Sequence, residues 1–318
     1  MIRGNTGFEI GLILRVNNPA RMVRPTSLEV VMPAVLEIDD GAAAWWESPD
    51  IWVVPGSDPL GPPGVPSAGR PAYVWARVRN RGTTSVLSAR VDFWWANPSA
   101  GVTRTLATQF GSAFVDVATG ATEEVLCLSP WVPTFVNGGH ECLVCEVVST
   151  LDPLPSPAPD AFDPPAFHQI GQRNLSVLAV APMVLSLQIG TDVRATAGSL
   201  ELIVDVGGEL DKAALASLGL AKWRVAKEPL VAAGLSRSSV CSGPVESRLA
   251  VPIEPGVVSG AFVHFDPNAR RKADKPNVDT ATAETYTLVR VRQGDTKRGP
   301  GITYVVCAAD PKVGGHRA

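Results

Sequence analysis

The sequence predicts an all-β protein built of two β-sandwiches in tandem, preceded by a β-rich N-terminal arm. The first observation is the number of turn-forming residues, since 29 Gly and 28 Pro in 318 residues exceed the roughly 12% of average usage. The second is that the short segments between turns alternate apolar and polar residues, as half-buried strands do. The third is a composition of 45% hydrophobic and 19% charged residues, which supplies apolar surface for a core and excludes intrinsic disorder.

A shift in charge divides the chain. Residues 1–180 contain 11 Arg, no Lys and 17 acidic residues, whereas residues 181–318 have a net charge of +3. Such a shift indicates separate domains, and the opposite signs permit attraction between copies. Together with Pro182, it predicts an arm over 1–48, a first sandwich over 49–181 and a second over 182–318 with a frayed C-terminal tail.

Strands of the first sandwich follow from the alternation. The segment Pro71–Arg79 places Tyr73 and Trp75 on one face and Val74 and Ala76 on the other, as a strand requires. Further strands are expected at 90–95, 112–117, 123–128, 141–148 and 173–180, with turn signals about every ten residues. The segment Asp152–Pro165 is expected to be an extended loop, because its prolines cannot donate to a central ladder.

The second sandwich is expected to contain strands at 183–190, 200–206, 248–253, 259–265, 284–291 and 302–308. One helix is expected to interrupt them over Glu209–Trp223, where Leu210, Ala214 and Leu218 share a face. Asp211 and Lys222 would lie in its first and last turns, as the helix dipole favours.

The arm contains candidate strands at Glu9–Val16, Leu28–Val31 and Ala34–Ile38. It is too short to form a core of its own. We therefore expect it to pack on the first sandwich or on a neighbouring chain.

The five cysteines do not predict a disulfide framework, because their number is odd and they are widely spaced. A bridge between Cys241 and Cys307 is the one open alternative. His140, Cys142 and Cys145, with Cys127 nearby, have the residue types of a zinc site. However, Cys142 and Cys145 lie three apart on a predicted strand and so face opposite sides. We expect buried thiols and no metal.

No motif predicts an enzyme or a cofactor. The chain has four histidines, no G-x-S-x-G elbow, no P-loop and no G-x-G-x-x-G that opens a helix. We therefore assign no catalytic residues. The cluster Arg270, Arg271, Lys272 and Lys275 lacks interleaved aromatic residues, so we expect no nucleic-acid partner.

Export is not expected. Met1–Val16 lacks the charged-then-apolar run and cleavage site of a signal peptide. No segment reaches the ~18 apolar residues of a membrane span. We expect cytoplasmic synthesis and assembly, or a place in a virion-like particle, rather than a secreted surface protein.

The tryptophans are the most unusual feature of the composition. Seven of the eight lie between residues 45 and 131. Neighbouring strand residues face opposite ways, so only one of Trp94 and Trp95 can lie in a core. Trp45, Trp46, Trp52 and Trp94 are therefore the candidate binding residues, either as subunit contacts or as a sugar-stacking platform. The alternative is packing against the arm or the second sandwich.

The first sandwich resembles the cell-adhesion-related bacterial (CARDB) immunoglobulin-like domain. The matching segments are Asp50–Trp52, Tyr73–Gly82, Val91–Ala96, the Gly139-His140 turn into Cys142-Leu143, and Gln172–Val177 as the last strand. The resemblance implies a seven-stranded Greek-key sandwich, used for adhesion, spacing or assembly, with no catalytic residues. The second sandwich is similar to immunoglobulin-like domains only in general.

These observations together predict a non-enzymatic structural or interaction subunit. We expect it to build or decorate a bacterial or phage-like assembly, such as a filament, tail, capsid or injection system. Its partners would be other copies of itself or other subunits, joined through an exchanged N-terminal arm. The alternative hypothesis is a carbohydrate- or surface-binding adhesion module with a Trp-rich face.

Overall fold

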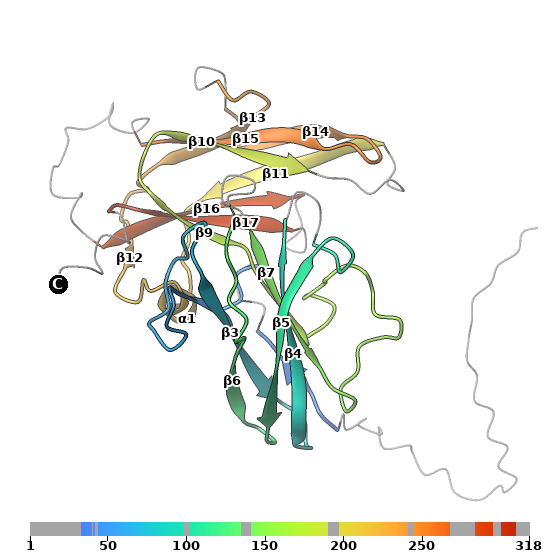
Figure 1. The fold of residues 1–318 in the computed structure, drawn as a ribbon. Helices are drawn as coiled ribbons and strands as arrows, with labels where there is room; N and C mark the ends of the chain where they lie inside the picture. The colour runs from blue at the N-terminus through green and yellow to red at the C-terminus, as the bar shows by residue number, and fades with distance from the viewer. Residues whose placement is uncertain are drawn as a thin grey trace, which may run out of the picture. The chain divides into compact units, whose positions relative to one another are not determined.

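The computed structural model confirms an all-β protein, because its described residues form seventeen strands and one short helix (Figure 1). The structure describes residues 33–39, 41, 44–97, 102–134, 141–189, 197–240, 245–267, 284–294 and 300–309. The expected strands at 9–16 and 28–31, the basic cluster at 270–275, His140 and Cys241 lie outside these ranges. Within them, no helix is long and apolar enough to cross a membrane.

Two four-stranded sheets form what we call the first sheet pair. In one sheet, the central strand β3 is bordered by β6 on one edge and by β1 and β2, in succession, on the other. The other sheet has the order β5-β4-β7-β8. The strands are β1 (Leu36–Glu37), β2 (Ile51–Pro55), β3 (Ala72–Asn80), β4 (Val86–Ala96), β5 (Thr108–Val117), β6 (Thr122–Leu126), β7 (Cys142–Val148) and β8 (Ile170–Arg173).

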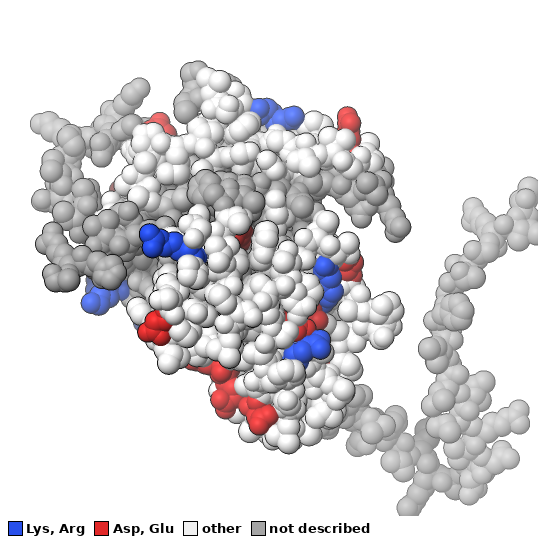
Figure 2. Space-filling view, in the orientation of Figure 1, with Lys and Arg blue, Asp and Glu red and all other residues white. Residues whose placement is uncertain are grey.

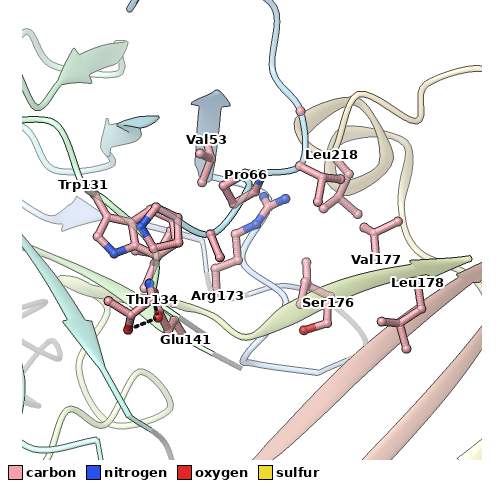
Figure 3. A pocket seen from close by; sticks show the side chains of 16 residues that line it. Val53, Pro66, Trp131, Thr134, Glu141, Arg173, Ser176, Val177, Leu178 and Leu218 are labelled. Atoms are coloured by element: carbon pink, nitrogen blue, oxygen red, sulfur yellow. Dashed lines mark hydrogen bonds between the residues drawn. The ribbon is translucent and has the colours of Figure 1, made fainter. Parts of the chain in front are cut away.

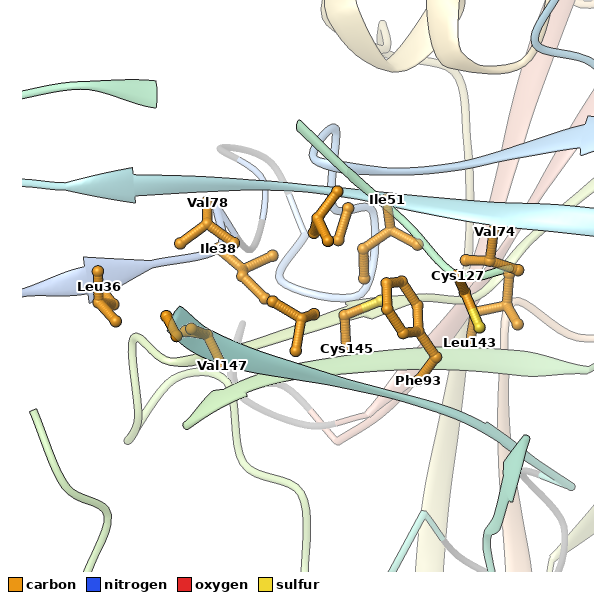
Figure 4. Packing of buried hydrophobic residues seen from close by; sticks show 14 of the residues in the cluster. Leu36, Ile38, Ile51, Val74, Val78, Phe93, Cys127, Leu143, Cys145 and Val147 are labelled. Atoms are coloured by element: carbon orange, nitrogen blue, oxygen red, sulfur yellow. The ribbon is translucent and has the colours of Figure 1, made fainter. Parts of the chain in front are cut away.

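One hydrophobic core fills the space between these two sheets. Along β3, buried residues alternate with half-buried ones, so the predicted faces of this strand are confirmed. Val74 and Val78 of β3 meet Phe93 of β4 and Cys145 of β7 in this core (Figure 4). The period of two in the sequence thus sets which side of each strand is removed from water.

The described part of the N-terminal arm belongs to this core. Leu36 and Ile38 are fully buried in it, and Leu36 pairs with Asn80 at the end of β3. Gly82 allows this close approach, since a Cβ there would lie 2.5 Å from Cα of Ala34. Residues 34–39 therefore pack on the sheets that follow them in the chain. This was one of the two expectations for the arm.

A six-stranded and a three-stranded sheet form the second sheet pair. The larger has the order β14-β11-β16-β17-β9, with β12 also paired to β16, and the smaller has the order β10-β15-β13. Phe265 and Tyr304 make an edge-to-face contact at 5.2 Å in the core between them. The strands are β9 (Leu175–Ala179), β10 (Met183–Ile189), β11 (Gly198–Val206), β12 (Arg224–Val225), β13 (Ala232–Ser236), β14 (Arg248–Ile253), β15 (Ser259–Asp266), β16 (Thr285–Gln293) and β17 (Gly301–Cys307).

The helix is shorter than predicted, because α1 covers only Lys212–Ser217. Asp211 is its N-cap, and the carboxylate accepts a hydrogen bond from the backbone of Ala214 at 2.6 Å, so the predicted place of Asp211 inside the first turn is wrong. Gly219, with φ of +73°, ends the helix in a Schellman motif, in which Leu220 N–H bonds the carbonyl of Leu215. Lys222 lies beyond the helix end.

The change from the first sheet pair to the second occurs at Asn174, not at Pro182. β8 pairs with β7 of the first pair, whereas β9 runs parallel to β17 of the second. A single strand across 173–180 was expected. The structure divides that segment between two sheets. It also contains β12 and β13, which were not predicted.

Candidate functional site

Trp46 holds the two sheet pairs together. Its side chain is 2% exposed, and its indole N–H donates to Oγ1 of Thr303 at 3.0 Å. The ring covers Gly301 so closely that a Cβ there would lie 2.4 Å from it. Trp45 is partly buried and contacts Trp46 edge to face, with ring centroids 5.6 Å apart. Trp46 is therefore unavailable as a sugar-stacking surface.

Trp52 is also withdrawn from solvent, at 8% exposed. It stacks on Trp75 with ring centroids 5.8 Å apart and an interplanar angle of 9°, and Arg77 lies 5.2 Å above its ring. Trp75 in turn donates to the carbonyl of Pro59 at 3.0 Å. These rings form an internally satisfied ladder on one face of the sheet.

Trp94 faces away from the core that contains Trp95, as the alternation predicts. It is partly buried against Phe162, with ring centroids 5.5 Å apart. Phe162 comes from the proline-rich segment, so that segment covers the outer side of β4. The four candidate tryptophans thus lie at separate contacts, and only Trp45 and Trp46 touch each other. Trp46 and Trp52 are buried by packing within the chain, whereas Trp45 and Trp94 are partly buried, so the prediction of a subunit contact or a sugar-stacking surface now rests on Trp45 and Trp94.

The thiols and histidines make structural contacts. Cys145 and Cys142 are fully buried on opposite sides of β7, in two different clusters, which confirms the predicted geometry. Burial raises the pKa of both thiols, so neither is a reactive thiolate. His168 contacts Asp152 at 3.0 Å, and Asp152 also accepts the backbone N–H of Leu36 at 2.7 Å.

A serine and a histidine meet in the second sheet pair. Oγ of Ser236 lies 2.7 Å from Nε2 of His264. The carbonyl of Ser238 lies 2.6 Å from that Oγ and 3.0 Å from that Nε2. A carbonyl only accepts, so the hydroxyl of Ser236 donates to it and does not direct its proton at Nε2 of His264.

The outer edge of β5 is the candidate interface. β5 pairs with β4 and ends its sheet. At ten residues it is the longest edge strand among the described sheets, since the other edge strands have seven residues or fewer. An unpaired edge presents a row of N–H and C=O groups that can accept another strand. We call Thr108–Val117 the β5 edge.

The core-facing side chains of the β5 edge are apolar, and the other face is polar except for one large apolar residue. Phe110, Ala113 and Val115 point to the core but are only partly buried, which leaves the margin of the core uncovered. Phe114, on the other face, is 64% exposed. The strand contains no Lys, Arg or Pro, which protect edges in many proteins, and its one charged residue is Asp116. Figure 2 shows that charges on this side of the molecule occur in small groups separated by uncharged areas.

A strand was predicted at 112–117, whereas its place at the edge of a sheet was not. One signal was available: Lys, Arg and Pro are missing from Thr108–Val117. The alternation does not extend to Thr108, because a bulge near Phe110 breaks the register with β4. What the sequence cannot supply is the position of a strand within its sheet, because that depends on pairing over long distances.

The fold and these contacts define an all-β protein with two pairs of packed sheets. No protein-family model matches the chain, and no curated protein matches it. Among solved structures, the chain is similar to the CupB6 tip adhesin from Pseudomonas aeruginosa, with 8% identity, coverage of 87% of this chain and 98% of that chain, and a TM-score of 0.20. A TM-score this low carries no argument about fold or function.

Proposed function

We propose that this protein is a non-enzymatic structural subunit, which assembles when the N-terminal arm of one copy adds a strand to the β5 edge of another. The observation that carries the proposal is the length of the β5 edge, together with its uncovered apolar margin. Main-chain hydrogen bonds would provide the affinity, and the alternate side chains would set the register.

The arm has the sequence pattern that this edge requires. From Phe8 to Val16, apolar residues at 8, 10, 12, 14 and 16 alternate with Glu9, Gly11, Ile13 and Arg15. A strand of this pattern buries one apolar face. That face would cover the half-buried side chains of Phe110, Ala113 and Val115, which the protein's own sheets leave open.

The proposed partner is a second copy of this chain. The segment precedes β1 by 19 residues between Val16 and Leu36, and such a chain spans up to about 60 Å when extended. This length permits exchange between neighbours. Pairing of the arm with its own β5 is the competing outcome, and it would leave the protein a monomer.

We also propose that both sheet pairs are immunoglobulin-like sandwiches and that the first is CARDB-like. In support, β1, β2, β3 and β6 face β4, β5, β7 and β8 across one core, so the chain crosses repeatedly between sheets as in Greek-key sandwiches. Tandem sandwiches of this kind serve as rigid spacers in assemblies, and no described side-chain cluster suggests catalysis.

Sedimentation velocity over a range of concentrations tests the proposal. We expect the full chain to associate, and the double variant Ile10→Asp, Leu12→Asp to remain a monomer because its strand can no longer bury an apolar face. Phe114→Lys should weaken association about tenfold or more, since a lysine protects an edge. Leu60→Lys is the matched control, because Leu60 is 76% exposed on a loop away from the edge. A monomeric full chain, or association that all variants retain, would reject the proposal.

A further inference from the structure

A cavity of about 190 Å³ lies where the two sheet pairs meet. Its wall combines polar and apolar groups, and the apolar side chains include Val53 and Leu143 from the first sheet pair and Leu178 and Leu218 from the second. Two side chains with buried N–H donors, Trp131 and Arg173, also line it (Figure 3). Small-molecule sites likewise combine apolar side chains with polar groups that fix the orientation of the ligand.

Arg173 is a buried cation without an acidic partner among the described residues. Its side chain is 5% exposed, and its guanidinium donates to the carbonyl of Ile51 and to the Oγ and carbonyl of Ser217, the last two at 2.6 and 3.3 Å. All three acceptors are neutral. Burial lowers the pKa of this guanidinium to about 10, so it still carries its charge at neutral pH. A buried charge without a counter-ion is costly, and a carboxylate would offset that cost.

Trp131 supplies the second donor. The residue is 5% exposed, and its Nε1 is buried without a hydrogen-bond partner. Its backbone is fixed by two hydrogen bonds with Ala72, both at 2.8 Å, so the ring has a defined position at the cavity. A buried donor that lacks an acceptor costs stability until an acceptor arrives.

Glu141 sets the orientation of any anion in this cavity. Its Oε1 accepts hydrogen bonds from the backbone N–H and the hydroxyl of Thr134, both at 2.6 Å. In Figure 3, Glu141 and Thr134 lie together near Trp131, whereas the guanidinium of Arg173 points toward Pro66 and Leu218. A negative group would therefore avoid the Glu141 end and bind at the Arg173 end.

We propose that this cavity binds a small organic acid that carries a neutral oxygen a few carbons from its carboxylate. The carboxylate accepts hydrogen bonds from the guanidinium of Arg173, and the keto or hydroxyl oxygen accepts a hydrogen bond from Nε1–H of Trp131. The short carbon chain contacts the apolar side chains of the wall. The proposal is independent of strand exchange, because no residue of the β5 edge lines the cavity.

The test uses three probes of equal chain length and the full-length protein: 4-oxopentanoate, pentanoate and 4-oxopentanamide. Binding is followed by chemical-shift changes in NMR spectra. We expect 4-oxopentanoate to bind saturably, and each of the other two, which lack the ketone or the charge, to bind about tenfold more weakly. A concentration of about 20 mM exceeds the dissociation constant expected for so small a ligand. If 4-oxopentanoate showed no saturable binding up to this concentration, the proposal would be overturned.

Variants of Trp131 and Arg173 test which side chain binds the ketone of the ligand and which binds its carboxylate. Trp131→Phe keeps an aromatic ring but removes the N–H, so it should weaken 4-oxopentanoate about tenfold and leave pentanoate unchanged. Trp94→Phe is the matched control, because Nε1 of Trp94 is also buried without a hydrogen-bond partner but does not line this cavity.

Arg173→Met should abolish binding of both acids. Should that variant fail to fold, the comparison of acid with amide still decides the role of charge. Equal binding of all three probes, or an unchanged affinity in Trp131→Phe, would contradict the assignment.

Discussion

Glu47 and Arg290 form a two-pronged ion pair, with Nε to Oε1 at 2.6 Å and Nη2 to Oε2 at 3.0 Å, although 243 residues separate them in the chain. Glu47 is 4% exposed, and Oγ1 of Thr303 donates to the same carboxylate. The pair joins the segment before β2 to β16 and β17. It lies beside the contact between Trp46 and Gly301, so charge and packing fix the same junction.

Glu47→Gln should lower the free energy of unfolding by about 3 kcal/mol, because the guanidinium of Arg290 would remain largely buried without its counter-ion. Chemical denaturation measures this loss. Glu201→Gln is the control, since Glu201 pairs with Arg248 on the surface and should cost less than about 1 kcal/mol. Equal losses in the two variants would show that the buried pair does not hold the junction.

Gly301→Ala should destabilise the protein by about 1–3 kcal/mol, because its methyl group would overlap the ring of Trp46. Gly260→Ala offers a comparison within a strand, since nothing lies within 4 Å of a Cβ at that position. Differential scanning calorimetry of the two variants gives the measurement. If both shift the Tm by the same amount, the cost comes from the strand and not from Trp46.

Stability should depend on pH through His168. The hydrogen bond with Asp152 raises the pKa of His168 above its ordinary 6.5. A raised pKa in the folded protein means that this stabilisation is fully present below about pH 6.5 and is lost as pH rises through the folded-state pKa. His168→Gln should therefore reduce stability at pH 5.5 more than at pH 8.5, as denaturation at the two pH values would show. A difference that grows with pH would contradict the assignment.

Much of the fold could be predicted from the sequence, because strand faces depend on local alternation. Arg248–Ile253 was predicted with its observed bounds, and β3 and β10 differ from their predictions by a single residue at one or both ends. The prediction placed the end of the helix too late, because an Ala- and Leu-rich composition extends past Gly219. That glycine adopts a positive φ and approaches the carbonyl of Pro63, and such a contact is invisible in local propensity.

The candidate site was harder to predict. The tryptophans attract attention by composition, yet Trp46 and Trp52 are buried by segments far away in the chain. The pairing of Glu47 with Arg290 and the isolation of Arg173 also arise from contacts between distant strands. Residue type alone indicates neither which charges find partners nor which strand ends a sheet.

Hydrogen exchange of the β5 edge tests the central proposal most directly. Amide exchange of Thr108–Val117 would be measured in the full chain at low and high concentration, and in the Ile10→Asp, Leu12→Asp variant. Strand addition predicts that exchange in this segment slows with association in the full chain and stays fast in the variant. Association of the full chain without any slowing of exchange in Thr108–Val117 would contradict it.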